Sequence, residues 1–242
     1  MSRWAPLPLL GLSVIPCTFG TLRVVEVFGG PQVMPSNARI ASGPVPAVVH
    51  IVCGSAFLVL GALQFSAPVR RRWPAWHRRA GRWLVPLGLA AAASALWMTL
   101  VYPTQTGTGS VLKVSRVLFA AGLTTCLAVG YRAIKRRDVQ RHRAFMMRAY
   151  ALALGAGTQA FTIGIGQGVF GKTLLTTDLS TASGWILNLA IAEVILRSNG
   201  TNPVRRRSLT LRSAGGEAGR RGPASQSVQR RPMTGPRSAP RS

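Results

Sequence analysis

Acidic residues are scarce in this chain of 242 residues, which has five Asp and Glu against thirty Lys and Arg. Only 14% of the residues are charged and 48% are hydrophobic, a balance that does not suit a soluble globular domain. The sequence also lacks a Gly-rich phosphate loop, a CxxC pair and the HExxH and GxSxG motifs. No recognisable nucleotide-binding, metalloprotease or serine hydrolase site is therefore present.

Cysteine is also rare, with three residues at positions 17, 53 and 126. Their number is odd, their spacing fits no metal or redox motif, and all three lie inside apolar runs. We interpret them as small residues of the core that say nothing about the redox compartment.

Long apolar runs are what the sequence has in abundance. Most are about 20 residues long, which at about 1.5 Å per helical residue spans a hydrocarbon core of about 30 Å. We predict an all-α, polytopic integral membrane bundle of about six transmembrane helices. The runs cover residues 5–28, 46–66, 81–102, 111–134, 147–170 and 184–196. The last is short unless residues 180–183 belong to it. The first is interpreted as a retained anchor, since no small-residue cleavage site follows it.

The basic residues alternate between loops. Six Arg lie between Arg70 and Arg82 and seven Lys or Arg between Arg132 and Arg148, whereas the intervening loops carry one basic residue each. The positive-inside rule then places both termini in the cytoplasm of a plasma-membrane protein. Since topology explains most of the charge of +25, nucleic-acid binding is not expected.

The composition changes at residue 198. Residues 1–197 read as one transmembrane bundle, whereas residues 198–242 are rich in Arg, Ser, Gly and Pro and cannot bury enough apolar surface to fold. We predict a disordered basic tail. It either contacts anionic lipid or only reinforces the topology. Within the fifth run, Gly155, Gly157, Gly164 and Gly168 favour close approach of a neighbouring helix.

Ionisable residues within the spans form two predicted groups, since such residues are functional candidates in a membrane. The outer polar cluster comprises Arg23, Glu26, His50, Arg116 and Gln167. It is either a site for a small molecule, a quinone or protons, or a set of contacts that lock the helices, with Arg23 and Glu26 paired at a spacing of three residues.

The inner polar cluster lies where basic loops become helices. It comprises Gln64, His77, Arg78, Arg82, His142, Arg143, Arg148 and Glu193. Glu193 is expected to pair with Arg82 or Arg148. The cluster is predicted to hold the bundle together and to bind an anionic headgroup.

His77 and His142 are the one histidine pair that a haem b group could join, because His50 lies about 22 Å from the inner end of its span. Their loops are wet and strongly cationic, a setting that encloses a macrocycle poorly. No cofactor or metal ion is therefore expected, and haem ligation stays an open alternative.

The order of motifs resembles one known family. PAVVHIVCGSAFLVLGALQFS, RRRWPAWHRRAGRW, DVQRHRAFMMRAYALALGAGTQ and GWILNLAIAEVIL resemble a bacterial family of multi-pass membrane proteins, domain of unknown function 2306, over about residues 46–196. The chain departs from the family's pattern at Phe145, Phe161 and Thr162. The resemblance implies a membrane bundle and no activity.

Three classes of function are thus carried forward. The first is a membrane protein with lipid as its partner, which binds a lipid headgroup or small molecule at the Arg and His clusters. The second is a haem- or quinone-linked membrane oxidoreductase subunit. The third is a small-solute transporter, for which the nearly uncharged centre of the membrane is unfavourable. The sequence leaves open whether the protein is an enzyme and what its oligomeric state is.

Overall fold

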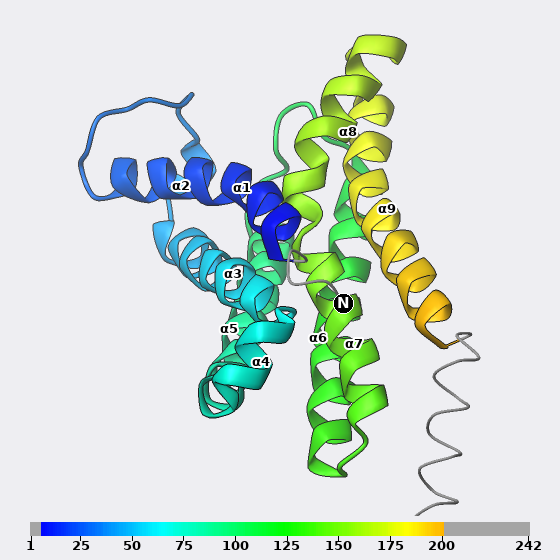
Figure 1. Ribbon diagram of the computed structural model, residues 1–242. Coiled ribbons are helices and arrows are strands. Elements are labelled where there is room, and N and C mark those ends of the chain that lie inside the picture. Colours follow the sequence, from blue (N-terminus) through cyan, green and yellow to red (C-terminus); the bar gives the residue numbers. More distant parts are fainter. Residues whose placement is uncertain (1–5, 201–242) are drawn as a thin grey trace, which may run out of the picture. The chain divides into compact units, whose positions relative to one another are not determined.

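The computed structural model describes residues 6–200, which are helical and contain no strand. The helices pack within one compact unit that extends to Arg197 (Figure 1). The predicted tail, residues 198–242, lies beyond the described residues apart from its first three. The helices in chain order are α1 (Pro6–Val27), α2 (Ala38–Ala41), α3 (Pro44–Gln64), α4 (Ala67–Arg72), α5 (Pro74–Val101), α6 (Ser110–Lys135), α7 (Val139–Ala153), α8 (Gly155–Phe170) and α9 (Leu174–Gly200).

Five of these helices are long and apolar enough to cross a membrane. They are Pro6–Val27, Pro44–Gln64, Pro74–Val101, Ser110–Lys135 and Leu174–Ser198. The polytopic helical architecture predicted from the apolar runs is therefore confirmed. The last span is full length, because the helix already begins at Leu174 and includes residues 180–183.

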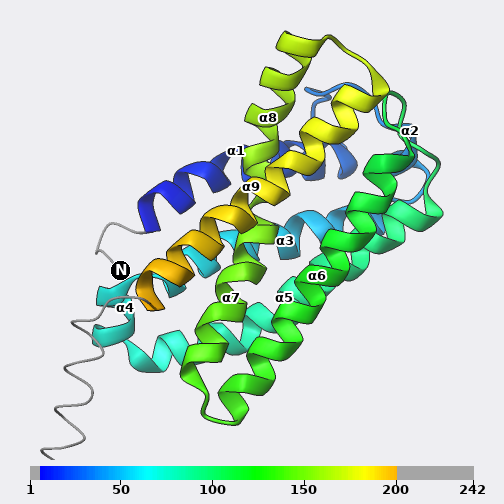
Figure 2. The ribbon, with the colours of Figure 1, turned by 90° about the vertical axis from the view of Figure 1, so that its right-hand side faces the viewer.

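The fifth apolar run is not one continuous helix, which corrects the sequence prediction. The chain forms α7 and α8, of 15 and 16 residues, which meet at Leu154 (Figure 1, Figure 2). Carbonyls in the last turn of α7 have no partner within that helix. Asn188 of α9 donates to one of them, the Ala151 oxygen, at 3.2 Å and accepts from the Thr158 hydroxyl at 2.9 Å. The neighbouring helix α9 thus supplies hydrogen bonds to groups on both sides of the break between α7 and α8.

Helix starts explain much of the chain path. Prolines occupy the first turns of α3, α4 and α5, where a missing N–H costs nothing. The Ser66 hydroxyl caps α4, and the Asp138 carboxylate caps α7 by accepting from the Arg141 N–H at 2.9 Å. Helix α6 begins after Gly109, which has no side chain to cap it. Its cap comes from a side chain of α9.

The core lies where α3, α5, α6 and α7 meet. Phe57, Leu84, Leu127 and Tyr150 are nearly fully buried there, and the Tyr150 hydroxyl donates to the Leu58 carbonyl at 2.9 Å. Helices α6 and α7 lie side by side as a hairpin in both views (Figure 1, Figure 2). This hairpin and the α3–α5 pair, which is joined by α4, bring two loops to one end of the bundle. We name this end the α4 end, and the opposite end the α2 end.

Two of the four glycines singled out in the fifth run make close helix contacts. A Cβ added at Gly155 would collide with the Trp185 ring, and one at Gly157 with the Leu12 carbonyl of α1. Gly164 and Gly168 have no atom within 4 Å of such a Cβ. Of these four positions, the two at the start of α8 permit close approach of α1 and α9, and Gly166 further along α8 does the same against Ser180 of α9.

Candidate functional site

A group of polar side chains from four helices meets at the α4 end, and we call it the basic cluster. Its members are Gln64 of α3, Arg70 of α4, His77 of α5, and His142 and Arg143 of α7. All five are half-buried. The Arg70 guanidinium donates to the Gln64 carbonyl at 3.2 Å. The Ser66 cap starts α4 directly after α3, which turns Arg70 back towards this carbonyl.

Two nitrogens of the basic cluster are buried and have no hydrogen-bond partner. They are the Gln64 Nε2 and the His77 Nδ1. Buried polar atoms are nearly always paired, so each unpaired atom calls for a partner of some kind. His77 interacts electrostatically with Arg70 and His142, both basic. The site therefore offers unused hydrogen-bonding groups in positive surroundings.

Positive groups crowd one another in this cluster. Burial, and then the nearby guanidiniums of Arg143 and Arg71, lower the pKa of the Arg70 side chain. His142 is held in place by a hydrogen bond from its Nδ1 to the Gly130 carbonyl of α6, at 2.9 Å. No carboxylate of the described residues pairs with Arg70 or Arg143. The arrangement suits an anion.

Four residues predicted for the inner polar cluster are not part of the basic cluster, although the charge of Arg78 acts on His77. Arg78 and Arg82 are exposed on α5. Arg148 and Glu193 pair with each other through two hydrogen bonds, of which the one from Arg148 NH2 to Oε2 measures 3.1 Å. This pair links α7 to α9. Of the two partners expected for Glu193, the structure selects Arg148.

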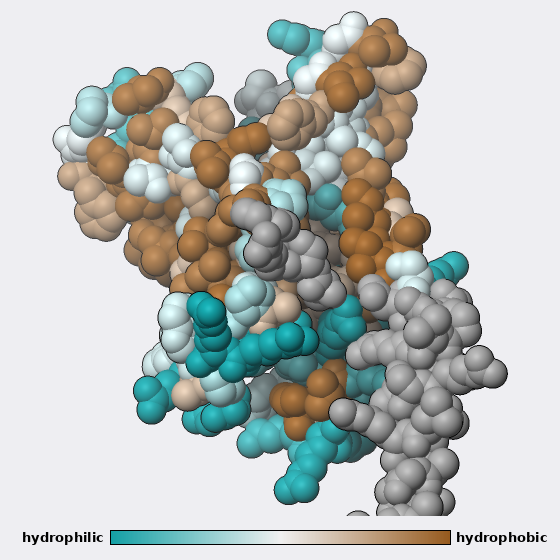
Figure 3. Space-filling view, viewed as in Figure 1, coloured by the Kyte–Doolittle hydropathy of each residue, from teal (hydrophilic) through white to brown (hydrophobic). Residues whose placement is uncertain are grey.

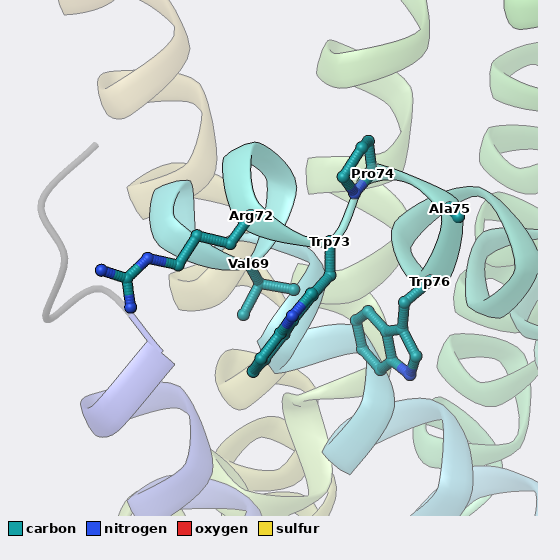
Figure 4. A pocket seen from close by; sticks show the side chains of 6 residues that line it. All are labelled: Val69, Arg72, Trp73, Pro74, Ala75 and Trp76. Carbon is teal, nitrogen blue, oxygen red and sulfur yellow. The ribbon is translucent and has the colours of Figure 1, made fainter.

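Hydrophilic residues gather over α4 and the turn between α6 and α7, whereas α1, α3 and α9 present mainly hydrophobic surface (Figure 3). Beside this polar end, a pocket of about 470 Å³ lies at the junction of α4 and α5. Figure 4 shows the indole rings of Trp73 and Trp76 on the same side of this junction, while the Arg72 side chain extends away. The pocket thus has aromatic walls and lies next to the basic cluster along α4 and α5.

The two histidines proposed for haem do lie in one cluster. However, the neighbours of His77 include the basic side chains of Arg70, Arg78 and His142. Guanidinium groups make poor walls for an apolar macrocycle. In the described part of the chain, no three His, Cys, Asp or Glu side chains come together as a metal site.

At the α2 end, the predicted pair of Arg23 and Glu26 forms, with an N–O distance of 2.8 Å. The other Glu26 oxygen accepts from the Val33 and Met34 N–H groups, at 2.8 and 2.7 Å. Arg23 also donates to the Pro35 carbonyl at 3.0 Å. These contacts fasten the loop after α1 to α1 itself and do not join two helices.

The remaining residues of the outer polar cluster separate. His50 and Arg116 both line a cavity inside the bundle, and the His50 Nδ1 donates to the Ala91 carbonyl of α5 at 2.8 Å. Gln167 lies elsewhere and donates to the Thr177 hydroxyl of α9 at 3.1 Å. The outer polar cluster is therefore three separate features rather than one site.

Asp178 is the residue that sequence reasoning missed. It is 1% exposed, and its two oxygens accept from the Gly109 and Leu112 N–H groups at 2.9 and 3.0 Å. This carboxylate of α9 thereby caps the start of α6. Asp178 is one of only five acids and lies two residues before the extension of the last apolar run, which was a usable signal.

Comparison with known protein families identifies the family of the chain. The family described as predicted membrane protein, domain of unknown function 2306, matches residues 47–196, more than half of the 242 residues. The chain belongs to this family. No curated protein and no solved structure matches it.

Membership of the family agrees with the five membrane-spanning helices and makes the chain a multi-pass membrane protein in contact with lipid. The matched segment contains the whole basic cluster together with His50 and Arg116. The Arg23–Glu26 pair precedes it. Both the cluster at the α4 end and the cavity in the bundle thus belong mainly to the family's part of the chain.

Proposed function

We propose that the protein binds the phosphate-bearing headgroup of an anionic membrane lipid at the basic cluster. The observation that carries this proposal is the convergence of Arg70, His77, His142 and Arg143, from three helices, around the unpaired nitrogens of Gln64 and His77. Guanidinium groups match phosphate oxygens in geometry as well as in charge.

The distribution of the acids supports an external anion as the partner. The structure describes four carboxylates, and each is already bound: Glu26 to Arg23, Asp138 to the start of α7, Asp178 to the start of α6, and Glu193 to Arg148. The chain therefore offers the basic cluster no carboxylate from its described residues. A lipid phosphate would supply the missing negative charge.

The pocket beside the cluster supports a lipid rather than a free ion. Trp73 and Trp76 form aromatic walls at the junction of α4 and α5, at the depth where indole rings favour the boundary between headgroups and acyl chains (Figure 4). Trp73 is 62% exposed, so its ring is accessible to a ligand. The glycerol region of a lipid would rest on these walls.

The proposal includes an orientation in which the α4 end and both termini face the cytoplasm of the plasma membrane, with α7 and α8 together making the sixth crossing beside the five long helices. The two loops at this end carry most of the bundle's basic residues, as the positive-inside rule requires. In a chain without its native cysteines, Arg137→Cys should resist, and Lys172→Cys should accept, an impermeant thiol reagent added to intact cells. The reverse pattern would contradict this orientation.

Melting of the purified protein tests headgroup binding. Added phosphatidylglycerol should raise the melting temperature in mild detergent more than phosphatidylcholine does. The double variant Arg70→Gln/Arg143→Gln should lose this preference. At about 1 kcal/mol for each basic residue near a lipid surface, its affinity for phosphatidylglycerol should fall about 30-fold.

The matched control is Arg132→Gln/Arg136→Gln, which removes the same charge from exposed positions at the same end. It should keep the preference for phosphatidylglycerol. Equal responses of the wild type to both lipids, or a double variant that still prefers phosphatidylglycerol, would refute the assignment. If Arg70→Gln/Arg143→Gln does not fold, Arg143→Lys should keep the preference and Arg143→Gln alone should weaken it.

A further inference from the structure

A second candidate site lies inside the bundle, towards the α2 end. A cavity of about 390 Å³ opens between α3, α5, α6, α8 and α9. Most of its lining is apolar, including Phe57, Ala95, Leu123 and Trp185. Its volume falls in the lower part of the range for small-molecule sites, which are typically apolar with a few convergent polar groups.

Two cationic side chains line this cavity. Arg39 of α2 and Arg116 of α6 both line it, and both reach the same neutral acceptor, the Gln105 Oε1, at 3.3 and 3.5 Å. The Arg39 Nε is buried without a partner. Two guanidiniums thus share one amide oxygen, which leaves most of their hydrogen-bonding capacity unused.

The acids nearest to these arginines are committed to other contacts. Both oxygens of Asp178 accept backbone N–H groups at the start of α6, and both oxygens of Glu26 are bound by Arg23 and the following loop. No carboxylate in residues 6–198 forms an ion pair with Arg39 or Arg116. Asp178 acts on Arg116 electrostatically but forms no ion pair with it, so the two partly buried guanidiniums keep hydrogen-bonding capacity for a ligand.

His50 adds a fixed polar group within the cavity. Its Nδ1 donates to the Ala91 carbonyl at 2.8 Å, and the Ser94 hydroxyl lies 3.5 Å from the same nitrogen. Because Nδ1 is the donor in this contact, Nε2 is left as the hydrogen-bonding atom for other partners. Phe57, Ala92 and Leu123 also line the cavity and give it apolar surface.

We propose that this cavity binds an amphipathic carboxylate, with the carboxylate on Arg39 and Arg116 and an alkyl or similar apolar body along Phe57, Ala95 and Leu123. The planar fork of a guanidinium suits a carboxylate, and the apolar lining suits the hydrocarbon part. The site is independent of the proposed headgroup site, since it lies at the other end of the bundle and shares no residue with it.

Photo-crosslinking in lipid nanodiscs tests this proposal. A diazirine-bearing dodecanoic acid should label peptides of α3, α5 and α6 that line the cavity. Unlabelled dodecanoate and dodecanol then compete for labelling. Dodecanoate and dodecanol partition differently into lipid, so their potencies as competitors are expressed as a ratio. The informative quantity is the change in this ratio between the wild type and a variant. Arg116→Gln should reduce the advantage of dodecanoate about tenfold.

Lys113→Gln is the matched control, because it removes one positive charge from an exposed position of the same helix, outside the cavity. It should leave the relative potency unchanged. Ala95→Phe, which fills the apolar part and keeps both arginines, should reduce labelling, and Arg116→Lys should retain it in part. Melting curves of all variants report whether they fold.

Three results would overturn the proposal. Labels confined to lipid-facing positions would mean that the cavity is not the site, and so would full labelling of Ala95→Phe. Unchanged relative potency in Arg116→Gln would mean that the arginine does not recognise the carboxylate. A dodecyl phosphate that competes far better than dodecanoate would replace the carboxylate with a phosphate ester as the recognised group.

Discussion

Each end of the bundle holds a pair of arginines without a carboxylate partner among the described residues, and the two pairs differ in what surrounds them. At the α4 end, Arg70 and Arg143 meet beside exposed arginines and the Trp73 pocket, at a surface that headgroups can reach. At the α2 end, Arg39 and Arg116 meet at the rim of an apolar cavity. Similar arginine pairs are therefore placed to select different ligands. Each pair would bind the anionic group, and the neighbouring surface decides which other part of the ligand fits.

A second contrast concerns the acids. Glu26, Asp138, Asp178 and Glu193 all stabilise helix starts, loops or helix pairs. Each carboxylate thereby serves the fold, while several arginines are left for other partners. With so few acids, the chain separates a structural set of charges from a set available for binding. The following changes test that separation.

The largest effect is expected from Asp178→Ala. This change leaves the Gly109 and Leu112 N–H groups without an acceptor in a buried setting and should lower the free energy of unfolding by about 3 kcal/mol. Asp138→Ala, which removes an exposed helix cap, should cost less. Unfolding of both variants in detergent measures the difference. Equal losses of unfolding free energy in the two variants would mean that burial of the Asp178 contacts adds nothing to their stabilising effect.

A smaller loss is expected where α1 packs on α8. A methyl group at Gly157 would collide with the Leu12 carbonyl, so Gly157→Ala should destabilise the protein by about 2 kcal/mol. Gly164→Ala, with no atom within 4 Å, should be neutral or slightly stabilising, since Ala favours a helix more than Gly does. Parallel melting curves compare the two. A neutral Gly157→Ala would show that α1 is not packed as described.

These examples show how far the sequence predicts this molecule. Apolar run length is enough to locate the spans, and a spacing of three residues is enough to pair Arg23 with Glu26. Both features are local along the chain. The Arg148–Glu193 pair was one of two options, because 45 residues separate the partners and only packing chooses between them.

Features that depend on distant segments were not predictable. Asp178 caps a helix that begins 68 residues earlier, through backbone groups that leave no trace in the sequence. The break between α7 and α8 lies among Leu, Gly and Ala residues that also suit a continuous span. Gln167 was grouped with His50 by depth alone, whereas the direction in which its side chain leaves α8 sets its partner, Thr177.

The break between α7 and α8 gives a third prediction. Asn188→Ala removes the hydrogen bonds to the Ala151 carbonyl and the Thr158 hydroxyl, and should cost about 1 kcal/mol, since hydrogen bonds between membrane helices contribute modestly. Ser183→Ala loses only a bond within α9, to the Ser180 carbonyl, and should have less effect. A loss for Ser183→Ala as large as that for Asn188→Ala would argue against this account of the break.

The last prediction is that the purified protein lacks the absorption band of haem. If the basic cluster serves an anion, the purified protein should show no Soret band before or after dithionite reduction, because the guanidiniums of Arg70 and Arg78 lie near His77. A band that shifts on reduction and disappears in His77→Ala or His142→Ala would reverse the assignment. The α4 end would then be an oxidoreductase site, and Arg70 and Arg143 would be available to bind haem propionates instead of lipid phosphates.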